Sequence, residues 1–173
     1  MAQDGVFKSM EQALKSPEEV VMLSLKRSKL KEWPEELCQF PNLKTLDLSN
    51  NRISTLPSDL SCLKGLESLN LTSNRLDSLQ NSISDLKSLK TLMLGNNEIY
   101  HITKEIGSLT NLETLELWSN NIYYLPIEAG EMAALKDLDL RNIQLKEEYQ
   151  EAMKAVFDNP DLRIRFSMSC NCD

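Results

Sequence analysis

The sequence is poor in the residues that carry most catalytic chemistry. It holds one histidine, His101, and only five glycines among 173 residues. A single histidine provides no histidine pair for a metal centre, and no glycine-rich phosphate loop is present. His101 itself lies in a loop segment, where a solvated or partner-facing side chain is the expected role. These shortages argue against an enzyme and lead us to expect no cofactor and no metal.

Long apolar runs and a surplus of positive charge are also missing. No segment approaches the ~18 apolar residues that a membrane span needs, and residues 1–20 lack the pattern of a signal peptide. Nineteen Lys and Arg against 26 Asp and Glu give a formal net charge of −7, which repels phosphate backbones. We therefore predict neither nucleic-acid binding nor membrane insertion. The compartment stays open: cytoplasmic if Met1 is the native start, secreted or at the cell surface if a signal peptide was removed.

What the sequence does contain is a repeat of 23 residues in an unbroken register. Each unit starts with an aliphatic residue, and further apolar residues follow at positions +3, +5 and +10 from that start. With 41% hydrophobic but only 6% aromatic residues, the predicted core consists of layers of aliphatic side chains. The six units start at Val20, Leu43, Leu66, Leu89, Leu112 and Leu135.

The spacing within a unit has a direct structural interpretation. The step from +3 to +5 has a period of two, which predicts a short strand with positions +2, +4 and +6 on its outer face. An asparagine at +8 can satisfy backbone groups in the buried bend that follows. Prolines such as Pro57 indicate an irregular or 3₁₀ return path. The predicted ladder of asparagines consists of Asn51, Asn74, Asn97 and Asn120.

The unit Leu43-x-x-Leu46-x-Leu48-x-x-Asn51-x-Ile53-x-x-Leu56-Pro57 resembles the leucine-rich repeat of the 23-residue Leu-Pro type, which is common in short bacterial proteins. The resemblance covers residues 20–145. It implies an α/β fold: a right-handed solenoid, or horseshoe arc, with a parallel β-sheet on its concave side. It also implies that the concave side binds other proteins.

We expect a single domain over residues 1–173. Residues 1–19 are predicted to form an N-terminal helical cap, with Val6, Phe7 and Met10 at helical spacing and a capping box at Ser16. Residues 20–145 are predicted to form six repeats, the sixth partial. The absence of Asn at +8 from the first and sixth repeats fits end positions, where stacking is one-sided. Residues 146–173 are predicted to form a helix, a strand ending near Phe166 and a tail.

Large or charged side chains gather in repeats four to six. Trp118 is the expected anchor because position +6 points away from the core; the alternative is that it only covers the sheet and that the tyrosines only shield the loop. Asp137 and Asp139 are expected to form an exposed acidic end of this surface. The predicted partner-binding residues are Met93, Tyr100, His101, Glu116, Trp118, Tyr123, Tyr124 and Arg141.

The four cysteines are too few for a disulfide framework. Cys170 and Cys172 are expected to be tail thiols that link an otherwise monomeric chain into an oxidised dimer, since a bond between them would be strained and zinc needs about four ligands. Cys38 and Cys62 fall in consecutive repeats, and we expect them to be unpaired apolar fillers although their spacing leaves pairing open.

The predicted function is non-catalytic recognition of a protein or peptide through the concave face. Two alternatives remain at this stage. In the first alternative, the chain is a regulatory or targeting subunit of a separate enzyme. In the second it is a thiol or metal protein that acts through Cys170-Asn171-Cys172.

Overall fold

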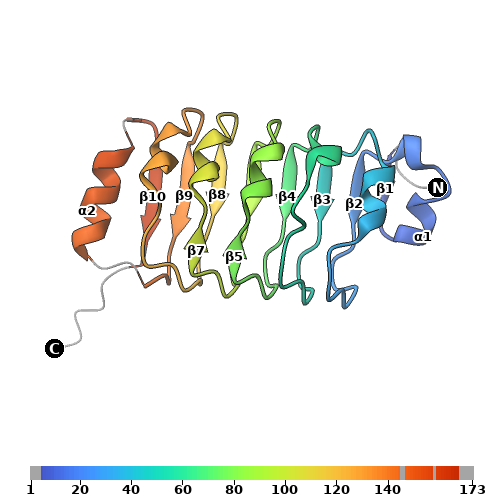
Figure 1. The fold of residues 1–173 in the computed structure, drawn as a ribbon, viewed down its shortest axis with the longest axis horizontal. Helices are drawn as coiled ribbons and strands as arrows, with labels where there is room; N and C mark the ends of the chain where they lie inside the picture. The colour runs from blue at the N-terminus through green and yellow to red at the C-terminus, as the bar shows by residue number, and fades with distance from the viewer. Residues whose placement is uncertain (1–4, 145–146, 158, 168–173) are drawn as a thin grey trace.

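The computed structural model describes residues 5–144, 147–157 and 159–167. Its successive coils stack side by side along one axis (Figure 1). Each coil contributes one strand to an eight-stranded sheet in the order β1-β2-β3-β4-β6-β8-β9-β10, in which every neighbouring pair is parallel. This arrangement confirms the predicted solenoid. The strands are β1 (Val6–Phe7), β2 (Met22–Ser24), β3 (Thr45–Asp47), β4 (Ser68–Asn70), β6 (Thr91–Met93), β8 (Thr114–Glu116), β9 (Asp137–Leu140) and β10 (Arg163–Phe166).

The opposite wall of each coil holds short 3₁₀ helices and a second, two-stranded sheet of β5 (Ser78–Leu79) and β7 (His101–Ile102), which lies in front of the main sheet in Figure 1. The leucine columns fill the space between the walls and are almost completely buried. No helix among the described residues is both long and apolar enough to cross a membrane. The 3₁₀ helices are η1 (Pro17–Glu19), η2 (Glu35–Gln39), η3 (Ser61–Leu63), η4 (Asn81–Asp85), η5 (Lys104–Ser108) and η6 (Ile127–Glu131).

Equal repeat length sets the register of the sheet. Leu46 of β3 pairs with Leu69 of β4, and Leu69 pairs with Leu92 of β6, so identical repeat positions stand side by side. At the last strand the sequence separation between paired residues is larger than one repeat, and Asp137 of β9 pairs with Arg163 of β10. The longer connection contains the helix α2 (Glu147–Val156). A residue's position in the repeat therefore predicts its sheet neighbours from β2 to β9, but not at the two end strands β1 and β10.

The asparagines at +8 form a hydrogen-bonded ladder. Asn74 Nδ2 donates to the carbonyl oxygens of Leu71 in its own repeat and Leu48 in the preceding one, both at 3.0 Å. Its Oδ1 accepts from the backbone N–H of Ile53 at 3.1 Å. Asn51 donates to the same Leu48 carbonyl at 2.8 Å, so neighbouring asparagines share acceptors. Each side chain thus satisfies the polar backbone of two coils.

Side chains of alternating charge form a second column at +1. Glu67 lies between Lys90, at 2.8 Å, and Lys44, at 3.4 Å. Glu113 pairs with Lys136 at 2.7 Å. Hydrogen bonds from Lys90 and Lys44, with the charge of Lys90, hold the pKa of Glu67 below its usual range. We call this row, Lys44, Glu67, Lys90, Glu113 and Lys136, the charge column.

The N-terminal cap differs from the expected helix. Val6 and Phe7 form the strand β1, which pairs with β2, and the helix α1 covers only Met10–Ala13. The strand forms because the backbone N–H groups of Val21 and Met22 donate to the Gly5 carbonyl at 2.9 and 2.8 Å, which brings the chain into the sheet.

The expected capping box at Ser16 is also wrong. The Ser16 side chain makes no capping hydrogen bond to η1. Ser9 caps α1 instead, accepting from the backbone N–H of Gln12 at 3.3 Å. At the other end, Leu145, Cys170 and Cys172 lie outside the described residues.

The expectation of unpaired Cys38 and Cys62 is wrong as well. Their sulfur atoms are joined in a disulfide, with the Cα atoms 5.3 Å apart. Cys38 lies in η2 and Cys62 in η3, on the wall opposite the main sheet, and both residues are exposed. Adjacent coils bring these two positions to the Cα separation that a disulfide needs. The bond therefore links the first two repeats covalently at their surface.

Candidate functional site

The structure places the eight predicted binding residues on two separate surfaces. Four lie on the outward face of the eight-stranded sheet, which we call the sheet face: Met93 in β6, Glu116 in β8, and Trp118 and Arg141 just after β8 and β9. The other four belong to the segment of the second sheet: His101 lies in β7, Tyr100 precedes it, and two tyrosines occupy the same repeat positions 23 residues later. The second sheet lies on the wall opposite the main sheet (Figure 1). We call this second group, Tyr100, His101, Tyr123 and Tyr124, the tyrosine patch.

The tyrosine patch is strongly exposed. Tyr100, Tyr123 and Tyr124 have exposed fractions of 56%, 54% and 49%. Tyr124 Oη lies 3.4 Å from His101 Nδ1, so residues one repeat apart contact each other as their common position predicts. Ile99 and Ile102, which flank Tyr100 and His101 in the sequence, are buried in the core. The tyrosine patch is therefore associated with the second sheet and the other four residues with the main sheet.

Trp118 is half-buried, and Gly95 decides its position. A Cβ on Gly95 would lie 2.7 Å from Trp118 Cδ2 and even closer to Cε2 and Nε1, so the indole covers the glycine of the preceding repeat. Trp118 Nε1 also donates to Glu116 Oε2 at 3.3 Å. The side chain does not project freely from the sheet. It is held by one packing contact and one hydrogen bond, and part of it remains accessible.

The expectation that Asp139 is exposed is wrong: its side chain is 1% exposed. Arg141 covers it, donating from Nε to Oδ1 at 2.9 Å and from Nη2 to Oδ2 at 2.6 Å. Arg165 of β10 approaches the same carboxylate, with Nη1 3.3 Å from Oδ2. Burial alone raises the pKa of Asp139, but the hydrogen bonds from Arg141 and the charge of Arg165 outweigh it and lower that pKa.

Arg165 also pairs with Asp137 at 2.8 Å, and sequence reasoning did not assign it to the site. The signal was available, because the alternation of β10 places Arg163 and Arg165 opposite the partly buried Ile164. These arginines extend the sheet face by one strand.

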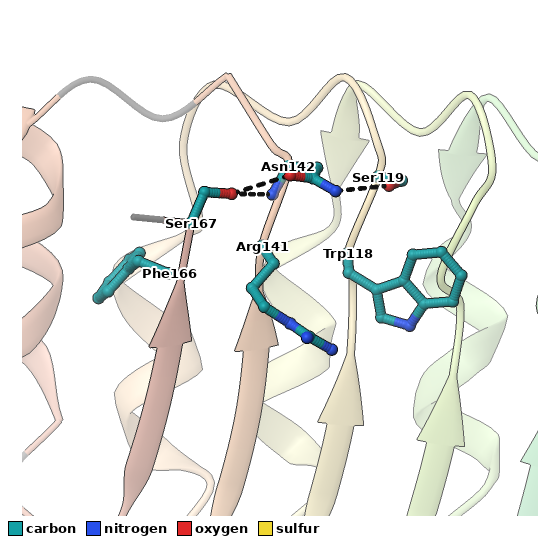
Figure 2. Close-up of a pocket in the computed structure, with 6 residues that line it drawn as sticks. All are labelled: Trp118, Ser119, Arg141, Asn142, Phe166 and Ser167. Atoms are coloured by element: carbon teal, nitrogen blue, oxygen red, sulfur yellow. Dashed lines mark hydrogen bonds between the residues drawn. The ribbon is translucent and has the colours of Figure 1, made fainter. Parts of the chain in front are cut away.

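An open groove lies beside Trp118, across the ends of the last three strands (Figure 2). Its volume is about 680 Å³. The Arg141 guanidinium extends toward the indole of Trp118 in Figure 2. The lining residues are Trp118, Ser119, Arg141, Asn142, Phe166 and Ser167, of which only Trp118 and Arg141 were predicted.

A row of polar side chains borders the groove. Asn142 Nδ2 donates to Ser119 Oγ at 3.4 Å, and Ser167 Oγ donates to Asn142 Oδ1 at 3.0 Å (Figure 2). The backbone N–H of Asn142 donates to Ser167 Oγ at 2.6 Å. Ser119 and Asn142 have positive φ values of 51° and 54°, and the same left-handed conformation recurs at +7 in every repeat. That recurrence fixes the row along the rim.

The arrangement is suited to non-covalent recognition. It offers a planar guanidinium, part of an indole and a row of hydroxyl and amide groups, each held by neighbours. Among the described residues, no three His, Cys, Asp or Glu side chains are grouped so that they hold a metal ion.

The family model of the leucine-rich repeat region matches residues 19–121. The chain belongs to the leucine-rich repeat family. Leucine-rich repeats are a general fold for recognition between proteins, and members of the family are typically not enzymes. No curated protein matches the chain.

Solved structures support the same fold. An internalin from Listeria monocytogenes is 23% identical with a TM-score of 0.74, over 87% of this chain and 42% of that one. A leucine-rich repeat protein from Leptospira interrogans is 25% identical with a TM-score of 0.65, over 96% and 58%. This chain therefore spans less than two thirds of either protein.

A third similar structure is the ectodomain of the plant membrane receptor kinase GASSHO1/SCHENGEN3 from Arabidopsis thaliana. It is 30% identical with a TM-score of 0.71, over 96% of this chain and 20% of that one. That ectodomain was solved in complex with CASPARIAN STRIP INTEGRITY FACTOR 2.

Proposed function

We propose that this chain is a non-catalytic recognition module that binds a protein or peptide through the C-terminal half of the sheet face, the concave face of the family. The observation that carries the proposal is the fixed pair of Trp118 and Arg141. Gly95 and Glu116 hold the indole, and buried Asp139 holds the guanidinium. Met93 and Glu116 complete the predicted contact surface.

Side chains that are ordered before binding lose little conformational entropy when a partner arrives. Trp and Arg are also enriched among the residues that dominate binding energy, and truncating such a residue costs ~2 kcal/mol or more. The complex formed by the Arabidopsis ectodomain supports this proposal by analogy of fold.

The experiment compares the two surfaces. Partner captured by wild-type protein from the native source is purified, and its affinity is measured for Trp118→Ala and Arg141→Ala. Each variant is expected to bind at least thirtyfold more weakly, which corresponds to ~2 kcal/mol. Tyr100→Ala combined with Tyr123→Ala serves as the matched control on the opposite wall. Loss of affinity only in this control would move the binding site to the tyrosine patch.

The same capture tests the alternative of a regulatory or targeting subunit, because that function requires the captured partner to be an enzyme. The thiol or metal alternative depends on Cys170 and Cys172, which lie outside the described residues. Elemental analysis and thiol titration of the purified protein test it, and a native mass spectrum compares the expected monomer with the oxidised dimer.

A further inference from the structure

The groove beside Trp118 presents a guanidinium whose plane is fixed. Arg141 makes three side-chain hydrogen bonds to Asp139, two from Nε and one from Nη2, and that carboxylate is itself 1% exposed. The Arg141 side chain nevertheless remains 51% exposed and extends toward Trp118 (Figure 2). The Nε and Nη2 edge of the guanidinium is therefore used for anchoring, while about half of the side chain stays accessible to a partner.

The charges around the groove select against ionic ligands. Among the described residues that line the groove, Arg141 is the only charged one, so a cation meets a guanidinium and no carboxylate there. An anion gains little, because Arg141 is already paired with Asp139 and Arg165 with both Asp137 and Asp139. A neutral group is the remaining match to this balanced cluster.

The shape and chemistry of the surface favour a neutral group that is also planar. Guanidinium groups stack on aromatic faces, and aromatic rings pack against one another edge to face or with an offset. The row of Ser119, Asn142 and Ser167 offers hydrogen-bonding partners at the rim. A phenol can stack on the guanidinium, pack against the indole and direct its hydroxyl group to the polar row. The volume of about 680 Å³ lies within the usual range for ligand pockets, so a side chain and its flanking peptide groups have room.

We propose that this groove receives an aromatic side chain of the partner, with tyrosine preferred, stacked on the guanidinium of Arg141 beside Trp118. The proposal rests on the proposed function and specifies what the partner presents at this site. It assigns Ser119, Asn142 and Ser167 the role of recognising the phenol hydroxyl.

The test uses small probes and the whole chain. N-acetyl-L-tyrosinamide is titrated into ¹⁵N-labelled protein while the resonances of Trp118 Nε1–H and Arg141 Nε–H are followed. The corresponding amides of phenylalanine, leucine, lysine and aspartate are the comparison probes. The expected order of affinity is tyrosine, then phenylalanine, then leucine, with no saturation by lysine or aspartate, and tyrosine binding is expected to be insensitive to salt.

Three outcomes would overturn the proposal: no shift with the tyrosine probe, equal affinity for leucine and tyrosine, or tightest binding by aspartate. The last outcome would indicate an anion site.

Variants then separate stacking from charge. Arg141→Lys keeps the charge and removes the plane, so affinity for the tyrosine probe is expected to fall at least tenfold. Arg163→Lys is the matched control on the same face and is expected to stay within twofold of wild type. Ser119→Ala is expected to reduce the preference for tyrosine over phenylalanine without affecting phenylalanine. If Arg141→Lys binds the tyrosine probe as wild type does, stacking is refuted.

Failure here is distinguishable from failure of the proposed function. If Trp118→Ala and Arg141→Ala lose the captured partner while no aromatic probe binds the wild-type protein, the recognition function stands and only the aromatic occupant is excluded.

Discussion

Replacing Asn74 with leucine tests the energetic role of the asparagine ladder. The substitution removes three hydrogen bonds with little change in side-chain size. The backbone N–H of Ile53 loses the Asn74 acceptor within the core, which costs about 1–3 kcal/mol. The carbonyls of Leu48 and Leu71 each keep a second donor, Asn51 and Asn97. Their losses are therefore limited to about 1 kcal/mol each, and the expected total is roughly 3–5 kcal/mol.

Unfolding by urea is monitored by circular dichroism, and the dependence of the unfolding free energy on urea concentration (the slope) is compared between variants. The matched control is Asn121→Leu, the same substitution at an exposed position, which should change stability by no more than about 0.5 kcal/mol. A loss below about 1 kcal/mol for Asn74→Leu, with an unchanged slope, would refute the view that the buried amide satisfies otherwise unpaired backbone groups.

Three further perturbations test other contacts. Gly95→Ala should displace the Trp118 indole and destabilise the protein by about 1–3 kcal/mol, with a changed near-UV circular dichroism spectrum; an unaltered spectrum would contradict the packing. Because the pKa of Glu67 is lowered on folding, its stabilisation exists above about pH 4.3 and disappears as the pH falls through the folded value. Glu67→Gln should therefore flatten the acid dependence of the melting temperature, and parallel curves would exclude the effect. Reducing the Cys38–Cys62 bond, with its sequence separation of 24, should lower the free energy of unfolding by about 3.5 kcal/mol. Identical urea midpoints with and without reductant would disprove that contribution.

Periodicity made most of the fold predictable, because every position repeats the same environment. The strands, the buried leucines and the ladder from Asn51 to Asn120 all follow from one unit of 23 residues. Prediction failed at the first strand, since the two adjacent apolar residues Val6 and Phe7 carry too little pattern to distinguish strand from helix. The pairing of β1 depends on the open edge of β2, which is a tertiary effect.

The candidate site was less predictable because it depends on contacts between columns. Trp118 follows Gly95 by one repeat at the same position, so its packing was visible in principle in the +6 column. The burial of Asp139 depends on Arg165, which arrives from a strand outside the repeat register. The disulfide joins positions that differ by one in the repeat, so a search along columns does not find Cys38 and Cys62.

The charge column limits which repeats can be duplicated to lengthen this solenoid. Its signs alternate from one repeat to the next, and the rim at +7 alternates as well, through Asn50, Ser73, Asn96, Ser119 and Asn142. Duplicating the single repeat 43–65 would place two copies of Lys44 side by side, and like charges on neighbouring strands repel. Duplicating residues 43–88 would preserve both alternations. A duplication of two repeats, 46 residues, therefore keeps both alternations, whereas a duplication of one 23-residue repeat breaks them.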